Sequence, residues 1–333
     1  MLKSLLDAPL SNEEKAQSFW DATKALFSSK SQTVLTSPTV PALGKRVCVF
    51  AHFDVMDRVD PHVFHHLRAF QSLGFDTIFV STCRRMKEAD RRQLLTICHK
   101  VILRKNNGYD FGSYRAGIRE MLKSHDYEQI VLTNDSVYGP LHDLKSIFDD
   151  FAQRPIDIWS ITDSYEHEYH LQSYFLVFSR KAWNHPLIQR FWNGFWHVKN
   201  KGAAIHLYEI GLSRAAKKAR LQLGAWCDTT EVIETSLKKA NTQFSAISGG
   251  TVPHDEIEKR RLLQLIDVSL GSNCNVSHFY WEYLIRDFRC PYLKVELLRD
   301  NPCRVPNVHF YRDFIPDSYP HELIREHLRR YGR

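Results

Sequence analysis

The stretch NNGYDFGSYRAG places amides, glycines and a carboxylate where a buried strand gives way to a helix. Gly108 permits a positive φ or a close approach of the backbone, and Asp110 occupies the position of a helix cap, with Phe111 in the first turn. The free N–H groups of a first turn suit an anion. A capped turn explains Asn107, Gly108 and Asp110 equally well, but it does not explain Arg115 beside them. From the residues alone, a ligand site and a structural turn both remain open.

A second polar stretch, TNDSVYGP, follows the apolar run QIVL. Asp135, flanked by Asn134 and Ser136, can hold a sugar hydroxyl or a divalent cation, because a cation that also binds phosphates needs only one or two protein carboxylates. The alternative is an Asx-turn that leads into Gly139 and Pro140.

Further candidates follow along the chain. The segment HLQSYFLVF places His170 and Gln172 on one face of an extended run, although a hydrogen-bonded core histidine is the commoner explanation. A general base needs a carboxylate within reach of an acceptor hydroxyl. The candidates are Asp163, Glu166, Glu168 and Glu209. A glutamate taken singly is more often solvated or ion-paired.

Apolar runs alternating with amphipathic runs must position these residues. Strands are predicted at 46–54, 76–83, 100–106, 129–140, 156–164 and 173–180, and the first helices at 62–74, 89–100 and 110–126. This alternation predicts an α/β fold: a mostly parallel open sheet with helices on both faces, plus a helical C-terminal region. Ligands of such sheets bind outside the carboxyl ends of the strands. The polar residues expected there are His52, Asp54, Asn106, Asn107, Asp110, Asn134, Asp135 and Ser136.

We expect three regions along the chain. Residues 1–45 comprise an N-terminal helix, capped by Ser11, and the linker SKSQTVLTSPTVPALGKR, which is rich in Ser, Thr and Pro. Residues 46–180 form the α/β core. Residues 181–333 form a mostly helical portion of the same domain.

Two long helices are predicted in the C-terminal portion. Residues 204–226 predict one that ends at Gly224, and residues 321–333 predict a basic amphipathic helix. A basic helix of this kind is more often a solvated face than a membrane anchor, although the contrast between its faces also fits a membrane surface.

Composition narrows the classes of partner. The net charge of +7 and the pI of about 9.0 suit an anionic partner, or serve only solubility. No basic patch interleaved with aromatic residues is evident, so we expect no nucleic-acid partner. The seven cysteines form no CxxC pair, which is typical of reduced thiols in a cytosolic protein. Because we find no signal peptide and no run of the ~20 apolar residues a membrane helix needs, we expect a cytoplasmic protein.

Together, the motifs resemble the rhamnan-synthesis F family of bacterial glycosyltransferases. The resemblance spans roughly residues 46–310 and leaves residues 1–45 outside. It rests on FAHFD (50–54), NNGYDFGSYRAGI (106–118), TNDSVYGP (133–140), HLQSYFLVF (170–178), YEIGLSR (208–214) and PYLKVELLRDNP (291–302).

The resemblance implies a GT-A-like transferase that uses a nucleotide-diphospho-sugar. Residues 46–180 would then bind the nucleotide sugar, and residues 181–333 would form the acceptor side. The strand-to-helix junction would cradle the nucleotide and the sugar. The donor-binding residues implied are His52, Asp54, Asn107, Gly108, Asp110, Phe111, Arg115, Asn134, Ser136, His170 and Gln172.

The resemblance also implies a place for the DxD signature of GT-A enzymes, and the sequence departs from it there. Asn134 and Ser136 stand where the two aspartates are expected, which leaves Asp135 as the single candidate ligand for Mg²⁺ or Mn²⁺. Arg and Lys side chains are the alternative means of neutralising a leaving diphosphate.

We therefore expect transfer of a sugar, rhamnose by default, to a hydroxyl of a growing cell-surface polysaccharide or O-antigen, with inversion at the anomeric carbon. Glu209 is the first candidate base, followed by Asp135 and Asp163. The expected partners are the nucleotide-sugar donor, a glycan or lipid-linked glycan acceptor and other polysaccharide-synthesis proteins, with peripheral contact at the inner face of the cytoplasmic membrane. The alternative is a catalytically degenerate module that binds a glycan or nucleotide within an assembly complex, which the incomplete DxD favours.

Overall fold

The computed structural model describes residues 11–17, 32–40, 43–83, 85–121, 126–195, 198, 200–248, 256–269 and 275–332. Within these ranges, no helix combines the length and the apolar character that crossing a membrane requires.

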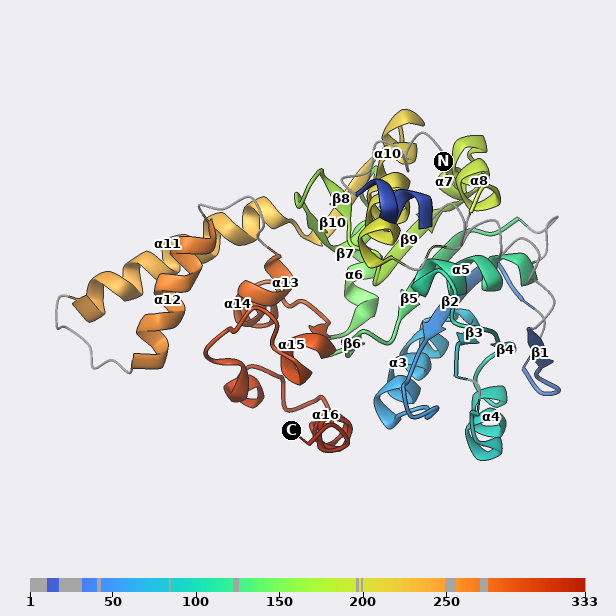
Figure 1. The fold of residues 1–333 in the computed structure, drawn as a ribbon, viewed down its shortest axis with the longest axis horizontal. Helices are drawn as coiled ribbons and strands as arrows, with labels where there is room; N and C mark the ends of the chain where they lie inside the picture. Colours follow the sequence, from blue (N-terminus) through green and yellow to red (C-terminus); the bar gives the residue numbers. More distant parts are fainter. Residues whose placement is uncertain are drawn as a thin grey trace. The chain divides into compact units, whose positions relative to one another are not determined.

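Four parallel strands form the centre of the main sheet (Figure 1). They are β2 (Arg46–His52), β3 (Asp76–Ser81), β4 (Lys100–Leu103) and β5 (Gln129–Asn134). His52 lies opposite Ser81, Ser81 lies opposite Leu103, and Ala51 lies opposite Asn134. The carboxyl ends of all four strands therefore meet along one margin of the sheet, which we call the carboxyl edge.

Further strands extend the sheet on both sides of this centre. Among the described residues the sheet has nine strands, in the order β1-β4-β3-β2-β5-β9-β7-β10, with β8 paired to β7. The added strands are β1 (Thr33–Thr36), β7 (Ile158–Ser164), β8 (His170–Leu171), β9 (Phe175–Ser179) and β10 (Leu223–Cys227). The predicted α/β class and open sheet are confirmed. Strand β1 is antiparallel to β4, and β9 is antiparallel to both β5 and β7.

Helices cover both faces of the parallel centre. The chain passes from β2 through β3 to β4 in one direction and then returns past β2 to β5. Because parallel crossovers are right-handed, α3 (Pro61–Ser72) and α4 (Glu88–Leu95) lie on one face, and α5 (Tyr109–Glu120) lies on the other. Helix α5 packs directly on β2, since a Cβ at Gly117 would collide with Val49 Cγ1.

Two segments differ from the sequence expectation. Thr33–Thr36, in the expected linker, form β1 and pair with β4. The predicted helix at 204–226 is confirmed as far as Lys218, as α9 (Lys201–Ala204), the π-helix η1 (Ile205–Ile210) and α10 (Gly211–Lys218), but its predicted end forms strand β10 instead. Tertiary pairing overrides local composition in both cases.

The expected N-terminal helix lies partly outside the described residues. Where it is described, Ser11 caps it in a reciprocal box: Glu14 N–H donates to Ser11 Oγ at 3.2 Å, and Ser11 N–H donates to Glu14 Oε2 at 2.9 Å. The Ser cap predicted from the sequence is thus confirmed.

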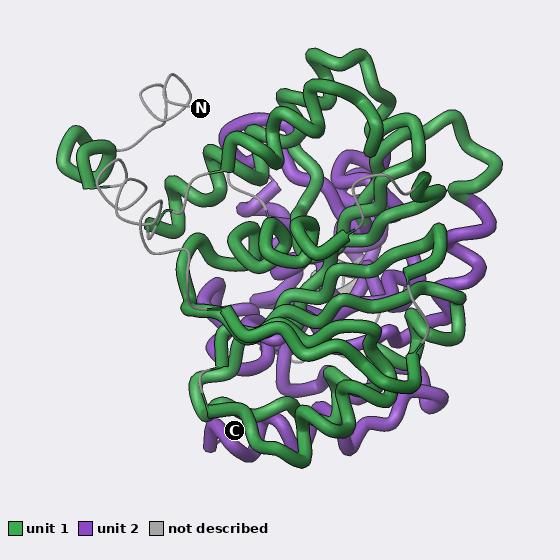
Figure 2. The backbone as a smooth tube through the Cα atoms, turned by 90° about the vertical axis from the view of Figure 1, so that its right-hand side faces the viewer, with its two compact units in different colours: residues 1–135, 151–160, 170–223 green, residues 136–150, 161–169, 224–333 purple. Residues whose placement is uncertain are grey.

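The chain forms two compact units (Figure 2). The first unit comprises residues 1–135, 151–160 and 170–223, and the second comprises residues 136–150, 161–169 and 224–333. The remaining helices are α6 (Leu144–Ala152), α7 (Arg180–Trp183), α8 (Pro186–Asn193), α11 (Thr229–Ser248), α12 (Glu256–Ser269), α13 (Val276–Phe279), α14 (Trp281–Arg286), α15 (Val295–Arg299), η2 (Val308–Asp313) and α16 (Glu322–Arg329).

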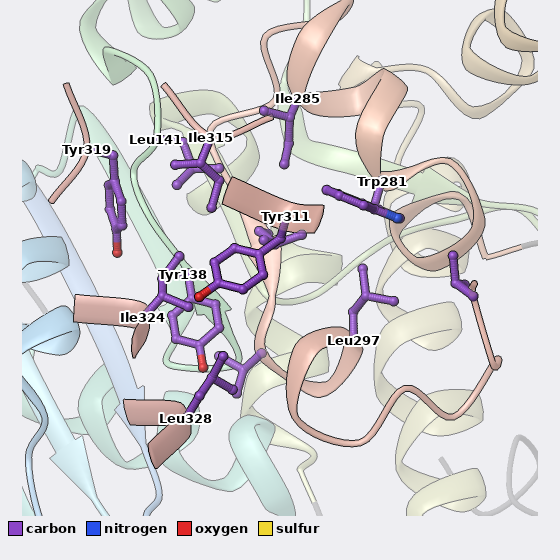
Figure 3. Close-up of a cluster of buried hydrophobic side chains, with 13 residues drawn as sticks. Tyr138, Leu141, Trp281, Ile285, Leu297, Tyr311, Ile315, Tyr319, Ile324 and Leu328 are labelled. Carbon is purple, nitrogen blue, oxygen red and sulfur yellow. The ribbon is translucent and has the colours of Figure 1, made fainter. Parts of the chain in front are cut away.

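The second unit has its own apolar cluster (Figure 3). A short two-stranded sheet, β6 (Val137–Tyr138) with β11 (Leu293–Lys294), contributes Tyr138 to it. Helix α16 contributes Ile324 and Leu328, and the Tyr138 hydroxyl is hydrogen-bonded to His327 Nδ1 at 2.7 Å. The apolar face of the predicted C-terminal amphipathic helix is therefore covered by protein, so this face is not available for a membrane.

Candidate functional site at the carboxyl edge

A left-handed glycine sets the junction between β4 and α5. Gly108 has φ +79° and precedes the first residue of α5, and its carbonyl accepts from Gly112 N–H at 2.8 Å. A Cβ at Gly112 would collide with Asn107 O and would lie 2.8 Å from Arg104 Nη2. Both glycines are needed for the backbone of this turn to close tightly against the strand end.

Arg104 stabilises the junction between β4 and α5 through hydrogen bonds. Its guanidinium donates to Ser113 Oγ at 3.0 Å and to the carbonyl oxygen of Asn107. Burial lowers the pKa of Arg104 to about 10, and the nearby Asp110 carboxylate acts in the opposite direction. The sequence analysis did not single out Arg104; the signal was a cation directly after β4, in front of the glycine turn.

The two polar motifs predicted from the sequence meet at the carboxyl edge. Asn134, at the end of β5, donates through Nδ2 to Asp110 Oδ2 at 2.8 Å. The next residue, Asp135, accepts from Phe53 N–H through Oδ2 at 2.9 Å, and the same oxygen lies 3.7 Å from His52 Nε2. The ends of β2 and β5 and the first turn of α5 thus bring Asp110 and Asp135 into one group, which we call the carboxylate group.

Asp135 is in an environment that disfavours its charge. Burial raises the pKa of Asp135 well above its ordinary value, and the negative charges of Asp110 and Asp54 add to the rise. The hydrogen bond from Phe53 N–H lowers the pKa of Asp135, but not enough to cancel the rise. The charged form of a carboxylate in this environment is stabilised most by a bound cation or by a hydrogen-bond donor on a ligand.

Glu209 and Tyr114 hold a turn beside this group. Glu209, on the π-helical segment η1, accepts from Ser173 N–H at 2.6 Å through Oε1, and Tyr114 donates its hydroxyl to Ser173 O at 2.9 Å. Burial raises the pKa of Tyr114, followed by the charges of Asp110 and Glu209, with Asp135 also contributing. One buried hydroxyl therefore lies in the field of all three carboxylates. Single π-helical turns are frequent at functional sites.

Other candidate residues have mainly structural contacts. Asp54 is buried, and its Oδ1 accepts from the N–H groups of Met56 and Arg58 at 2.9 and 3.1 Å. Phe111 is buried against Trp192 and Tyr208, with ring centroids 5.8 and 5.4 Å away. These contacts fix the positions of both side chains.

The remaining candidates in the first unit differ in exposure. His170 and Gln172 are buried, in and directly after β8. Arg115 is partly buried on α5, and burial lowers its pKa to about 10, with Arg119 adding to the effect. Within the described ranges, no carboxylate lies at ion-pair distance from Arg115. Asn107 contributes its backbone carbonyl to Arg104, as described above.

Two candidates belong to the second unit. Asp163 is fully buried in β7, where Oδ1 accepts from Thr229 N–H at 2.8 Å and thereby caps the start of α11. Burial raises the pKa of Asp163 as well. Ser136 contributes its backbone carbonyl to Val295 N–H at 2.9 Å. These contacts give both residues a part in building the second unit.

The chemistry of the donor set suits a hard divalent cation. Asp110 and Asp135 offer carboxylate oxygens at one edge, and Mg²⁺ and Mn²⁺ prefer such ligands. Among the residues that the structure describes, Asp135 belongs to no group of three ligand atoms within 4.8 Å of one another. A cation bound here would have to take its other ligands from substrate phosphates and water.

Comparison with known proteins gives a family match. The sequence model of one family, described as rhamnan synthesis protein F, matches residues 77–257, which is more than half of the chain. The matched range includes the glycine turn, both residues of the carboxylate group, and Glu209.

Two curated relatives and one solved structure are similar to the chain. The uncharacterized protein y4gN of Sinorhizobium fredii is 31% identical over 157 residues, which are 46% of this chain and 41% of that protein. The virulence protein VirA of Vibrio anguillarum is 26% identical over 275 residues, which are 80% of this chain and 83% of VirA. The chain thus spans less than half of y4gN and most of VirA. A cytidylyltransferase structure from Leptospira borgpetersenii covers 69% of this chain and 98% of its own, at 12% identity and a TM-score of 0.31.

Proposed function

The chain belongs to the rhamnan synthesis protein F family, and from this membership we propose that it is a glycosyltransferase acting in cell-surface polysaccharide synthesis. It transfers a sugar from a nucleotide-diphospho-sugar to a hydroxyl of a growing glycan. Rhamnose is the default sugar, because the family's description names rhamnan synthesis.

One observation carries this proposal: the carboxylate group lies at the carboxyl edge of a parallel sheet, next to the first turn of a helix. Ligands of open α/β sheets bind at this edge. The backbone N–H groups at the start of α5 and the guanidinium of Arg104 suit an anionic diphosphate. A scaffold protein has no need of two aspartates crowded against their own charge at such an edge.

Asp135 and Asp110 would hold a divalent cation together with the donor diphosphate. A cation here would neutralise charge on the leaving diphosphate. The raised pKa of Asp135 fits this assignment, since a positive ion would relieve the repulsion that raises it. Asn134 holds Asp110 in place, and Phe53 N–H holds Asp135.

We assign Glu209 as the general base in an inverting transfer. The acceptor hydroxyl attacks the anomeric carbon, its O–C bond forms as the bond to the diphosphate breaks, and its proton passes to the carboxylate. Ser173 N–H fixes Glu209 Oε1. Oε2 has no hydrogen bond within the described part of the chain, and the residue is only partly buried. Asp163 is left out of this mechanism because it is fully buried and bonded to Thr229.

The acceptor and the place of action follow from the proposed reaction. The acceptor is a glycan or lipid-linked glycan, such as an O-antigen, and the reaction takes place in the cytoplasm, where nucleotide sugars are made. Other polysaccharide-synthesis proteins are the expected partners.

The test is a thermal-shift panel of nucleoside diphosphates and nucleotide sugars, each with EDTA, Mg²⁺ or Mn²⁺. A ligand that binds the native state raises its melting temperature. We expect one nucleotide class to stand out and the cation to increase its effect. Asp135→Asn should abolish the cation's contribution. The matched control is Asp126→Asn, an exposed aspartate just before the amino end of β5, which should behave as wild type.

Turnover separates the transferase from the binding module. Release of the nucleoside diphosphate from the best donor, measured with and without acceptor, is expected for the enzyme. Binding without any release would favour the degenerate module instead. No shift with any nucleotide would refute both the donor assignment and the role given to the carboxylate group.

A further inference from the structure

The loop that follows β2 exposes three apolar side chains within four consecutive residues. Phe53, Val55 and Met56 are 49%, 65% and 47% exposed, and Val55 is the most exposed large hydrophobic residue in the described part of the chain. Single exposed apolar residues are ordinary on a protein surface, whereas a contiguous group marks an interaction site. The reaction proposed above gives no role to Val55 or Met56.

Buried contacts fix the shape of this loop. Asp54 is 7% exposed and accepts from the N–H groups of Met56 and Arg58. Its own N–H donates to Cys83 Sγ at 3.3 Å, which ties the base of the loop to the end of β3. Because the loop is already ordered, presenting Val55 and Met56 to a partner costs little conformational entropy.

Exposed cations lie on the same edge of the sheet. Arg58 follows β2, Arg85 and Lys87 follow β3, and Lys105 follows β4, and the parallel register places all three strand ends at the carboxyl edge. None of these four forms an ion pair with a described carboxylate. Nearby Glu88 lies 3.9 Å from Arg92.

We propose that the carboxyl edge docks on an anionic membrane surface through Val55 and Met56, with Arg58, Arg85, Lys87 and Lys105 contacting lipid headgroups. Apolar side chains next to unpaired cations are the combination that binds anionic bilayers, since each cation near the surface adds electrostatic attraction to the apolar insertion. The net charge of +7 acts in the same direction. Helix α16 does not serve this purpose with its apolar face, which the second unit covers.

The loop that follows β2 is in direct contact with the carboxylate group. Phe53 begins the loop, and its N–H donates to Asp135 Oδ2. Docking would therefore turn the carboxylate group toward the membrane surface, where a lipid-linked molecule could reach it without leaving the bilayer.

The test is flotation of the full chain with phosphatidylglycerol–phosphatidylcholine vesicles and with phosphatidylcholine vesicles, at low and high salt. We expect binding to the anionic vesicles that weakens with salt. Val55→Asp and Met56→Asp should each weaken it about tenfold, because an apolar side chain that would insert into the bilayer is replaced by a charge. The double change Arg85→Ala with Lys87→Ala should weaken it about 20-fold and reduce its salt dependence.

The matched control is Val34→Asp, which places the same charge at an exposed valine on β1, outside the loop. It should bind vesicles as wild type does. Melting temperature and nucleotide binding, measured on every variant, show that each is folded and keep this test separate from the proposed reaction. Absence of vesicle binding, or equal binding by wild type and the loop variants, would overturn the proposal. Loop variants that bind vesicles normally but lose association with another protein would overturn it in favour of a protein-docking surface.

Discussion

Asn134 Nδ2 donates to Asp110 Oδ2 over 2.8 Å and so joins the end of β5 to the first turn of α5. Two motifs that are separate in the sequence thereby become one site. The Asn134 amide supplies a donor to one carboxylate, that of Asp110, and the neighbouring residue, Asp135, supplies the second carboxylate of the site.

The first prediction concerns this amide. Asn134→Asp replaces a hydrogen-bond donor with a third carboxylate beside Asp110 and Asp135. We expect a lower melting temperature in EDTA, because a hydrogen bond to a charged group is worth about 1.5–3 kcal/mol and like charges now repel. Mg²⁺ or Mn²⁺ should restore more of the melting temperature in the variant than in wild type. Thermal shift across a cation titration measures both effects.

A suitable control is Asn184→Asp, an exposed asparagine at the end of α7, where the same change should alter neither quantity. An equal response to cations in Asn134→Asp and wild type would argue that no cation binds at the carboxylate group.

The second prediction concerns the dependence of stability on pH. The pKa of Asp135 is raised in the folded state, chiefly by burial, so the folded state binds more protons than the unfolded state between the two pKa values. The contribution of Asp135 is therefore most favourable below the ordinary pKa of an aspartate and is lost as pH rises toward the folded-state pKa. Asp135→Asn removes this loss, and we expect a variant that is more stable than wild type at neutral pH.

Urea unfolding in EDTA at a series of pH values measures this difference, with Asp126→Asn as the control. The gain in stability should shrink as the pH falls toward the ordinary pKa of aspartate. A variant that is less stable than wild type at neutral pH would mean that the charged form of Asp135 stabilises the fold. If Asp135→Asn is more stable than wild type but no longer binds the ligand, Asp135 serves function at the expense of stability.

The third prediction concerns the glycine turn. Gly112→Ala forces a Cβ against Asn107 O and close to Arg104 Nη2, both of which hold the start of α5. We expect a loss of about 1–3 kcal/mol in the free energy of unfolding, as for overpacking elsewhere, together with weaker nucleotide binding. Gly211→Ala is the control, since its nearest neighbours lie 3.6 Å away and alanine is the better helix former. It should be neutral or stabilising. Similar losses in both variants would show that crowding at Gly112 is not the cause.

The sequence predicts the parallel centre well because its pattern is local. The strands read as continuous apolar runs, since both faces are covered by helices, and the turn from β4 into α5 is marked by Gly108 and Asp110. Strand β1 was not predicted because Thr33–Thr36 have a composition typical of linkers and pair only with a strand distant in sequence. The sequence predicts the end of a helix where β10 lies for the same reason, because long-range pairing with β7, and not local composition, decides the conformation of this segment.

The site was predictable in its parts but not in its contacts. Asn, Asp and Gly at strand ends identify Asp110 and Asp135, whereas only the fold shows that Asn134 bridges to one of them. Arg104 was missed because a single cation after a strand is unremarkable in sequence. Asp163 and Glu209 are both candidate bases in the sequence. The structure distinguishes them, because Asp163 is fully buried and accepts a hydrogen bond from Thr229 N–H, whereas Glu209 is only partly buried and accepts one from Ser173 N–H. No pattern in a sequence reports such burial for a lone carboxylate.

The fourth prediction concerns Glu209. Glu209→Gln keeps an oxygen that can accept from Ser173 N–H but cannot take the acceptor's proton. We expect transfer to fall by about 10²–10⁴-fold, with nucleotide binding and melting temperature close to wild type. Glu128→Gln is the control, because this exposed glutamate lies just before the amino end of β5 and should leave transfer unchanged. Initial rates of transfer at saturating donor measure the effect. If Glu209→Gln retained full transfer, the base would be another group. If it instead lost its fold, the hydrogen bond to the turn at Ser173 would be the main role of this residue.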